Sequence, residues 1–195
     1  MRYHELMTDH EGPAGDLQQS PVRRVLTIGH SRHSIETFLA LLRQHQVEVL
    51  VDARSQPFSR FSPHFSRKAL ERAATAASIH YLFMGDALGG RPAPRECYDA
   101  DGNVDYDHVE QQAFYRDGID RLLDGIARFR VCLLCAEEDP SRCHRRLLVS
   151  RTLVRHGVEV RHIRGTGLLE VEQGFPANRE AMQLALLPVD GQRQR

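Results

Sequence analysis

Five short apolar runs divide the chain, and polar or glycine-containing segments separate them. Runs of this length with no polar alternation are typical of strands that a parallel sheet buries on both faces. The predicted strands are Val25–Ile28, Val47–Val51, Ile79–Phe83, Val131–Leu134 and Val158–Ile163.

Helical periodicity fills the intervals between these runs. Ser34 and Ser66 stand where each can cap a helix, and residues 119–126 repeat apolar side chains with the helical period. A further helix is expected to begin at Pro140 and to end at Gly157. Strands that alternate with helices indicate βαβ units and a parallel sheet.

The predicted fold is therefore a single α/β domain over residues 23–185, with a flexible arm at 1–22 and a flexible tail at 186–195. We expect a Rossmann-like, mostly parallel open sheet of about five strands with helices on both faces. In such sheets ligands bind beyond the carboxyl ends of the strands, which directs attention to the residues that follow each apolar run.

Composition adds little that is specific. The formal net charge of the 195 residues is zero, so no global attraction to nucleic acid is expected. No apolar stretch reaches the roughly 18 residues of a membrane span, and no signal-peptide core precedes the domain, which favours a cytoplasmic protein without membrane partners.

The few cysteines are expected to be reduced thiols. Cys132 and Cys135 form a C-x-x-C pattern, but on one strand they would point to opposite faces.

Chemically capable side chains gather at three strand ends. His30 follows the first strand, Asp52 ends the second, and Cys135 leaves the fourth just before Glu137. Cys135 is a candidate nucleophile, Asp52 and Glu137 are acid–base candidates, and His30 is a candidate proton carrier. Because βαβ crossovers return each strand to the same edge, we expect His30, Asp52 and Cys135 to share one pocket, closed by Gly89–Arg91 as a flap.

The helix opening at Ser141–His144 is a candidate anion cradle, since free N–H groups and the helix dipole both attract anions there. The spacing from Cys135 to Arg142 is one residue longer than a C-x5-R phosphatase loop and lacks its glycines. The candidate substrate-binding residues are Ser31, Arg54, Arg60, Arg91, Arg142, Cys143, His144 and Arg145.

Other interpretations stay open at this stage. Asp52 could form an ion pair that only fixes its loop, and Cys135 could be structural. Cysteines and histidines at the strand ends could bind a metal, although no zinc-finger spacing is present and no metal or other cofactor is expected. The residues concerned are His30, His33, Cys135, Cys143 and His144.

Five segments in a fixed order carry a family resemblance. They are Thr27–Ser31, Asp52-x-Arg54 with Pro57 and Ser59–Arg60, Leu88–Arg91, Cys135–Glu137 and Cys143–Arg145. Over about residues 25–163 the chain resembles the domain-of-unknown-function family 488. The resemblance implies a small bacterial or archaeal α/β cytosolic protein, and it supports the location of the site without naming a reaction.

The leading hypothesis is an enzyme that acts on a small anionic or nucleotide-like substrate, including a modified or damaged nucleic-acid component. It would use Cys135 with Asp52 or Glu137. One alternative is N-glycosidic cleavage by Asp52 or Glu137 with Cys135 structural. Two further alternatives are a non-catalytic module that binds nucleotides or nucleic acid, and a metal-binding protein. The sequence leaves the oligomeric state open.

Overall fold

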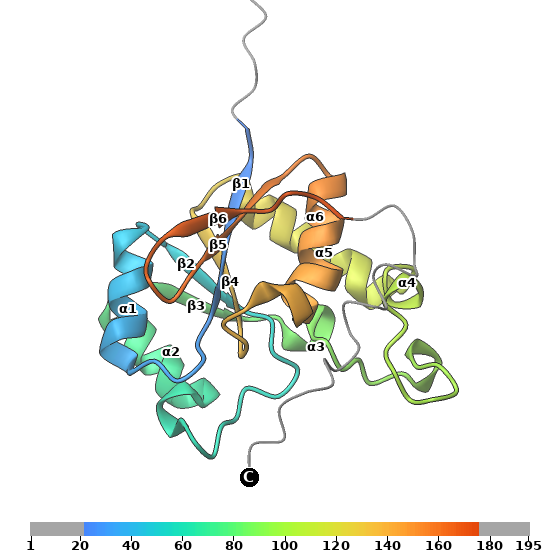
Figure 1. Ribbon diagram of the computed structural model, residues 1–195, viewed down its shortest axis with the longest axis horizontal. Coiled ribbons are helices and arrows are strands. Elements are labelled where there is room, and N and C mark those ends of the chain that lie inside the picture. Colours follow the sequence, from blue (N-terminus) through green and yellow to red (C-terminus); the bar gives the residue numbers. More distant parts are fainter. Residues whose placement is uncertain (1–21, 176–195) are drawn as a thin grey trace, which may run out of the picture.

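A single sheet organises the part of the chain that the computed structural model describes, residues 22–175 (Figure 1). Its strand order is β3-β2-β4-β1-β5-β6, and every pairing is parallel except that of β6 with β5. The strands are β1 Arg24–Gly29, β2 Val49–Asp52, β3 His80–Phe83, β4 Val131–Cys135, β5 Glu159–Ile163 and β6 Leu169–Val171. The predicted α/β class with a mostly parallel sheet is confirmed; β6 is an antiparallel edge strand that the sequence analysis did not predict.

Helices cover both faces of the sheet, as expected. Helices α1 and α2 lie on one side in Figure 1, and α3, α5 and α6 lie on the other. The helical elements are α1 Ile35–Gln44, η1 Pro63–Phe65, α2 Arg67–Ala76, α3 Gly85–Leu88, η2 Arg95–Cys97, α4 Tyr106–Val109, α5 Ala113–Ile126, η3 Pro140–Arg142, η4 Arg145–Ser150 and α6 Arg151–Arg155.

Alternation along the strands produces two separate apolar cores. In β4, Cys132 and Leu134 pack with α1 and α2, whereas Val131 and Leu133 pack with α5 and α6. All five residues of β4 are buried, because a central parallel strand is covered on both faces. Cys132 and Cys135 therefore do point to opposite faces, as their spacing predicts.

The strand order brings three polar strand ends together. Strand β4 lies between β1 and β2, with Gly29 opposite Cys135 and Asp52 opposite Leu134. Because these strands are parallel, His30, Asp52 and Cys135 all lie at the carboxyl edge of the sheet.

The segment after β4 departs from the single regular helix that the sequence predicts. A 3₁₀ turn (η3) comes first, a π-helical segment (η4) follows, and α6 completes the element. Within the π-helical segment the Ser150 hydroxyl donates to the Arg145 carbonyl at 2.7 Å. Gly157 follows α6 with φ of 72°, consistent with its predicted position at the helix end.

Gly29 is required where β1 passes the loop after β4. A methyl group at this position would overlap the carbonyl oxygen of Glu137 and would lie 2.6 Å from Nη1 of Arg145. The absence of a side chain therefore lets the β4 loop and a guanidinium pack directly on the β1 backbone.

The predicted arm at 1–22 and the predicted tail at 186–195 lie, apart from Val22, outside the described residues. Within residues 22–175, no helix combines the length and apolar character that crossing a bilayer requires.

We predict that Gly29→Ala lowers the free energy of unfolding by about 1–3 kcal/mol, because the added methyl group overpacks a site bounded by backbone. Gly125→Ala is the matched control. It lies in α5, where the added Cβ would meet only Val131 at 3.9 Å, so it should leave stability unchanged or raise it by up to about 1 kcal/mol. Urea denaturation of both variants measures the difference, and equal stabilities would contradict the close approach at Gly29.

Candidate functional site

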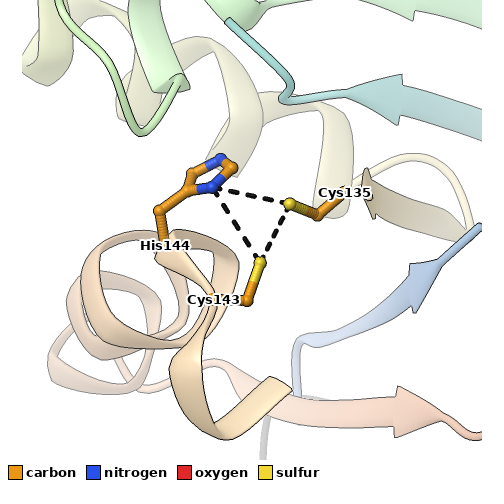
Figure 2. Close-up of side chains that lie close together, drawn as sticks. All are labelled: Cys135, Cys143 and His144. Carbon is orange, nitrogen blue, oxygen red and sulfur yellow. Dashed lines mark hydrogen bonds between the residues drawn. The ribbon is translucent and has the colours of Figure 1, made fainter. Parts of the chain in front are cut away.

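Two thiols and an imidazole converge at the carboxyl edge of the sheet (Figure 2). The sulfur of Cys143 lies 2.9 Å from that of Cys135, and Nδ1 of His144 lies 3.5 Å from the Cys135 sulfur and 3.9 Å from the Cys143 sulfur. Cys135 ends β4, while Cys143 and His144 lie between η3 and η4. The two cysteines are almost fully buried.

The His144 ring is held on its other side by backbone. Its Nε2 lies 2.9 Å from the carbonyl oxygen of Ala53, directly after β2, which fixes Nδ1 toward Cys135. Gly90 packs against the ring, because a methyl group there would lie 2.6 Å from Cγ of His144. The glycine segment that was expected to act as a flap therefore contacts the histidine.

The surroundings favour a thiolate at Cys135. The hydrogen bond from Cys143, together with His144 and the nearby Arg145, holds the pKa of Cys135 well below its usual value despite burial. Burial favours the neutral ring of His144, but the charge and hydrogen bond of Cys135 raise its pKa overall. The pKa of Cys143 is raised, chiefly because it donates to Cys135 and is buried. These shifts favour the deprotonated form of Cys135 and the protonated form of His144, with Cys143 as the hydrogen-bond donor.

Arg145 stabilises the loop after β4. It is fully buried, and its guanidinium donates to the carbonyl oxygen of Glu137 and, at 2.6 Å, to that of Glu138. The expectation that Arg145 binds substrate is therefore corrected, because its guanidinium is directed into backbone.

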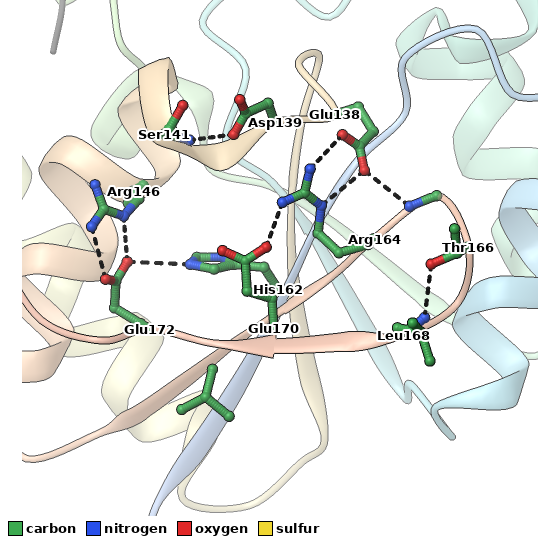
Figure 3. Close-up of polar contacts among 12 residues, drawn as sticks. Glu138, Asp139, Ser141, Arg146, His162, Arg164, Thr166, Leu168, Glu170 and Glu172 are labelled. Atoms are coloured by element: carbon green, nitrogen blue, oxygen red, sulfur yellow. Dashed lines mark hydrogen bonds and ion pairs between the residues drawn. The ribbon is translucent and has the colours of Figure 1, made fainter.

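The predicted anion cradle at Ser141–His144 is also wrong. The Asp139 carboxylate accepts from the Ser141 N–H at 2.9 Å, so the acidic run caps this turn itself (Figure 3). Glu138 is occupied as well, by Arg164 at 2.9 Å and by the Gly165 N–H at 3.0 Å. An anion would have to displace a carboxylate that already satisfies the free N–H.

Further ion pairs tie the neighbouring strands to the helical segment after β4. Glu172 accepts from Arg146 at 2.6 Å and lies 3.3 Å from Nε2 of His162 (Figure 3). Nδ1 of His162 lies 2.7 Å from the Thr27 hydroxyl. This chain connects β1, β5 and the segment after β6 to η4. It anchors η4, which directly follows Cys143 and His144.

Asp52 forms the structural ion pair that the sequence left as an alternative. Its two oxygens accept from Arg54 at 2.8 and 2.6 Å, and the Tyr81 hydroxyl donates to it at 2.6 Å. Arg54 also donates to the carbonyl of Phe65 at 2.9 Å. Asp52 is fully buried, so both groups fix the loop after β2 and neither faces the thiols.

His30 lies on the same face as Asp52. Its ring stacks on Phe65 with 4.4 Å between centroids, and burial, aided by the charge of Arg54, lowers its pKa. The structure thus brings His30, Asp52 and Cys135 to one edge of the sheet, but in two side-chain groups. His30 and Arg54, the partner of Asp52, contact Phe65, which packs in the core of α1 and α2, whereas Cys135 contacts Cys143 and His144. The His30 N–H donates to the Cys135 carbonyl at 3.0 Å, so the two residues are backbone neighbours, and a pocket shared by all three side chains stays a prediction.

The remaining predicted residues lie at the surface. Ser31 is half-buried with φ of 45°, and four others are exposed: Arg60, Arg91, Glu137 and Arg142. Among the described residues, the side chains of the three arginines have no ion-pair partner. The Arg91 backbone N–H is held by the Ser55 hydroxyl at 2.8 Å, which places Arg91 next to the glycine that packs on His144.

The same cluster has the composition of a metal centre. The ligand atoms of Cys135, Cys143 and His144 all lie within 4.8 Å of one another. Two thiolates and an imidazole suit zinc, with a fourth position left for water or substrate. His30 and His33 do not belong to this set, so the ligand group is smaller than the one considered from sequence.

The sequence presented Cys143 and His144 as substrate-binding candidates and grouped them with Cys135 only as possible metal ligands. It did not indicate the role of the Ala53 carbonyl or the packing of Gly90. The signals in the sequence were that Ala53 and Cys135 stand at the ends of predicted strands, that Gly90 stands in the glycine loop, and that Cys143 and His144 stand at a predicted helix opening.

Comparison with known proteins yields one match. The family model described as domain of unknown function DUF488 matches residues 34–152, more than half of the chain. No curated protein and no solved structure matches.

We predict that iodoacetamide labels Cys135 of the metal-free protein faster than Cys132 or Cys97, the pKa values of which burial raises. Because the pKa of Cys135 is lowered, its labelling should persist below about pH 8 and fall only as the pH passes below that lowered pKa. His144→Gln removes the imidazolium and should move the whole profile to higher pH. Peptide mapping after labelling at a series of pH values is the measurement. Faster labelling of Cys97 than of Cys135 in the native protein would show that Cys135 is structural.

Proposed function

The chain belongs to the DUF488 family, and we propose that it is an enzyme that uses Cys135 as a nucleophile on a small anionic or nucleotide-like substrate. The observation that carries this proposal is the Cys135–His144 pair, with 3.5 Å between the sulfur and Nδ1. A nucleophile, a base and a third group that orients the base form the arrangement that thiol enzymes require. Here the third group is the carbonyl oxygen of Ala53.

Each member of the cluster has a distinct task in the proposed reaction. The Cys135 thiolate attacks an electrophilic carbon or phosphorus, and His144 gives its proton to the departing group. Cys143 donates a hydrogen bond to the thiolate before attack. Water or an acceptor hydroxyl then attacks the adduct, neutral His144 takes the proton of that nucleophile, and cleavage of the bond to sulfur regenerates the thiolate. Glu137 is exposed beside this site and remains the acid–base candidate, whereas Asp52 is neutralised by Arg54.

The preference for an anionic substrate rests on unpaired arginines in the segments that follow β2, β3 and β4. Arg60, Arg91 and Arg142 are exposed, and none has an ion-pair partner among residues 22–175. Guanidinium groups bind phosphate or carboxylate through paired hydrogen bonds. A cytoplasmic location fits the proposal, because reducing conditions keep Cys135 and Cys143 as thiols.

A zinc enzyme is the second candidate, favoured by the ligand set of Cys135, Cys143 and His144. When bound, a zinc ion would supply a Lewis acid and a water of lowered pKa at its fourth position. Elemental analysis of the purified protein distinguishes the two candidates. About one zinc per chain, lost in Cys143→Ala, would replace the nucleophile proposal with this one.

We predict that Cys135→Ser abolishes turnover and that His144→Gln slows it by about 100-fold or more, since general acid–base catalysis contributes at least this factor. The protein is incubated with nucleoside monophosphates that carry normal, oxidised or alkylated bases, and products are quantified by chromatography with mass spectrometry. Acid quenching of the wild type should trap an adduct on Cys135.

Cys132→Ala is the control, because Cys132 packs on the opposite face of the sheet. Turnover that survives Cys135→Ala but is lost in Glu137→Gln would contradict the thiol mechanism and support N-glycosidic cleavage. Binding of these nucleotides with no product from any of them would support a non-catalytic module.

A further inference from the structure

Two phenylalanines are displayed to solvent in the loop that follows β2. Phe58 is 69% exposed and Phe61 is 100% exposed. In Figure 1 this loop extends from the carboxyl edge of the sheet toward the bottom of the view before the chain enters α2. Neighbouring large apolar side chains left in water mark a surface that contacts a partner.

The loop is held in place at several points. The Phe58 N–H donates to the Gln56 carbonyl at 2.8 Å, and the Ser62 N–H donates to the Ser59 hydroxyl at 3.0 Å. At its far end the Arg67 N–H donates to the Pro57 carbonyl at 2.8 Å. The two rings are therefore presented by a hydrogen-bonded loop, which lowers the entropy lost when a partner binds.

The charge of this segment points to an anionic partner. Residues 55–68 contain Arg60, Arg67 and Lys68, all exposed, and no acidic residue, although the chain as a whole is neutral. Arg67 and Lys68 occupy the first turn of α2, where the helix dipole disfavours cations. A bound anion would relieve that repulsion.

We propose that this loop binds single-stranded nucleic acid, with bases stacked on Phe58 and Phe61 and phosphates on Arg60 and the first turn of α2. Aromatic rings interleaved with cations are the usual means of holding unpaired bases and their backbone together. An apolar protein partner would not account for a segment that contains three cationic residues and no acidic residue.

The loop also begins at the proposed reaction site. Ala53, which precedes it, holds His144, and Ser55 holds the Arg91 backbone. A strand on the loop would present one nucleotide to Cys135. This role rests on the proposed function and narrows its substrate to a nucleotide within a single strand. Binding of the strand to the loop can be measured separately, without turnover.

Fluorescence anisotropy with a labelled single-stranded DNA and RNA 12-mer tests the proposal on the full chain. The double variant Phe58→Ala/Phe61→Ala should bind at least about tenfold more weakly, because each lost stacking contact weakens binding by that order. Arg60→Gln should reduce the slope of log K against log salt by about 0.7, the value for one phosphate contact with a single strand.

Phe129→Ala is the matched control. Phe129 is also exposed, at 44%, but it precedes β4 at the opposite edge of the sheet, so its loss should leave affinity unchanged. Circular dichroism of each variant checks the fold, which substitutions at exposed side chains should preserve.

Equal affinity of the wild type and the Phe58/Phe61 double variant would overturn the proposal. Equally tight binding of a duplex and a single strand would also overturn it, since a duplex hides the base faces. Binding to phosphatidylserine vesicles without binding to the 12-mers would overturn it as well. Cys135→Ser should bind the 12-mers like the wild type. Loop-dependent binding with no Cys135-dependent product would uphold docking while refuting the enzyme.

Discussion

One buried charge holds the carboxyl edge of the sheet together. The Arg145 guanidinium is out of contact with water, where a charge is tolerated only if hydrogen bonds replace its hydration. The carbonyl oxygens of Glu137 and Glu138 supply such bonds to Nη1 and Nη2, and the missing side chain of Gly29 makes room for them, while the buried Nε has no partner among the described residues. Because His144 directly precedes Arg145, anchoring the guanidinium also sets the imidazole opposite Cys135. The same positive charge favours the thiolate.

The strand ends divide structural and chemical tasks between the two faces of the sheet. Toward α1 and α2, Asp52 and Arg54 neutralise each other and fasten the loop after β2. Toward α5 and α6, Cys143 and His144 contact the Cys135 sulfur and, with Arg145, lower its pKa. The faces are coupled through backbone, since the residue between Asp52 and Arg54 provides the carbonyl that orients His144. The ion pair that fixes the loop after β2 on one face thereby also fixes the position of the His144 ring on the other face.

The sequence specified the strands of the central sheet and the edge at which polar residues meet, because buried parallel strands leave long apolar runs. It did not reveal β6, a three-residue edge strand without such a run, nor the π-helical segment, which depends on local hydrogen bonding. A carboxylate after a strand looks the same whether it is free or paired. Only the fold shows that Arg54 turns back on Asp52 and that Tyr81 reaches it. Likewise, the adjacency of Cys143 and His144 does not disclose which ring nitrogen faces Cys135.

The Cys135–His144 pair is assembled from segments far apart in the chain: its orienting carbonyl is at position 53, its packing glycine at 90, and its imidazole at 144. On the ribosome, the carbonyl and the glycine are synthesised well before the sulfur, and the imidazole follows it by nine residues. A nascent chain that ends before His144 therefore carries an ordinary thiol. The contacts that lower the pKa of Cys135 form only after Cys143, His144 and Arg145 have been synthesised and have packed against the end of β4.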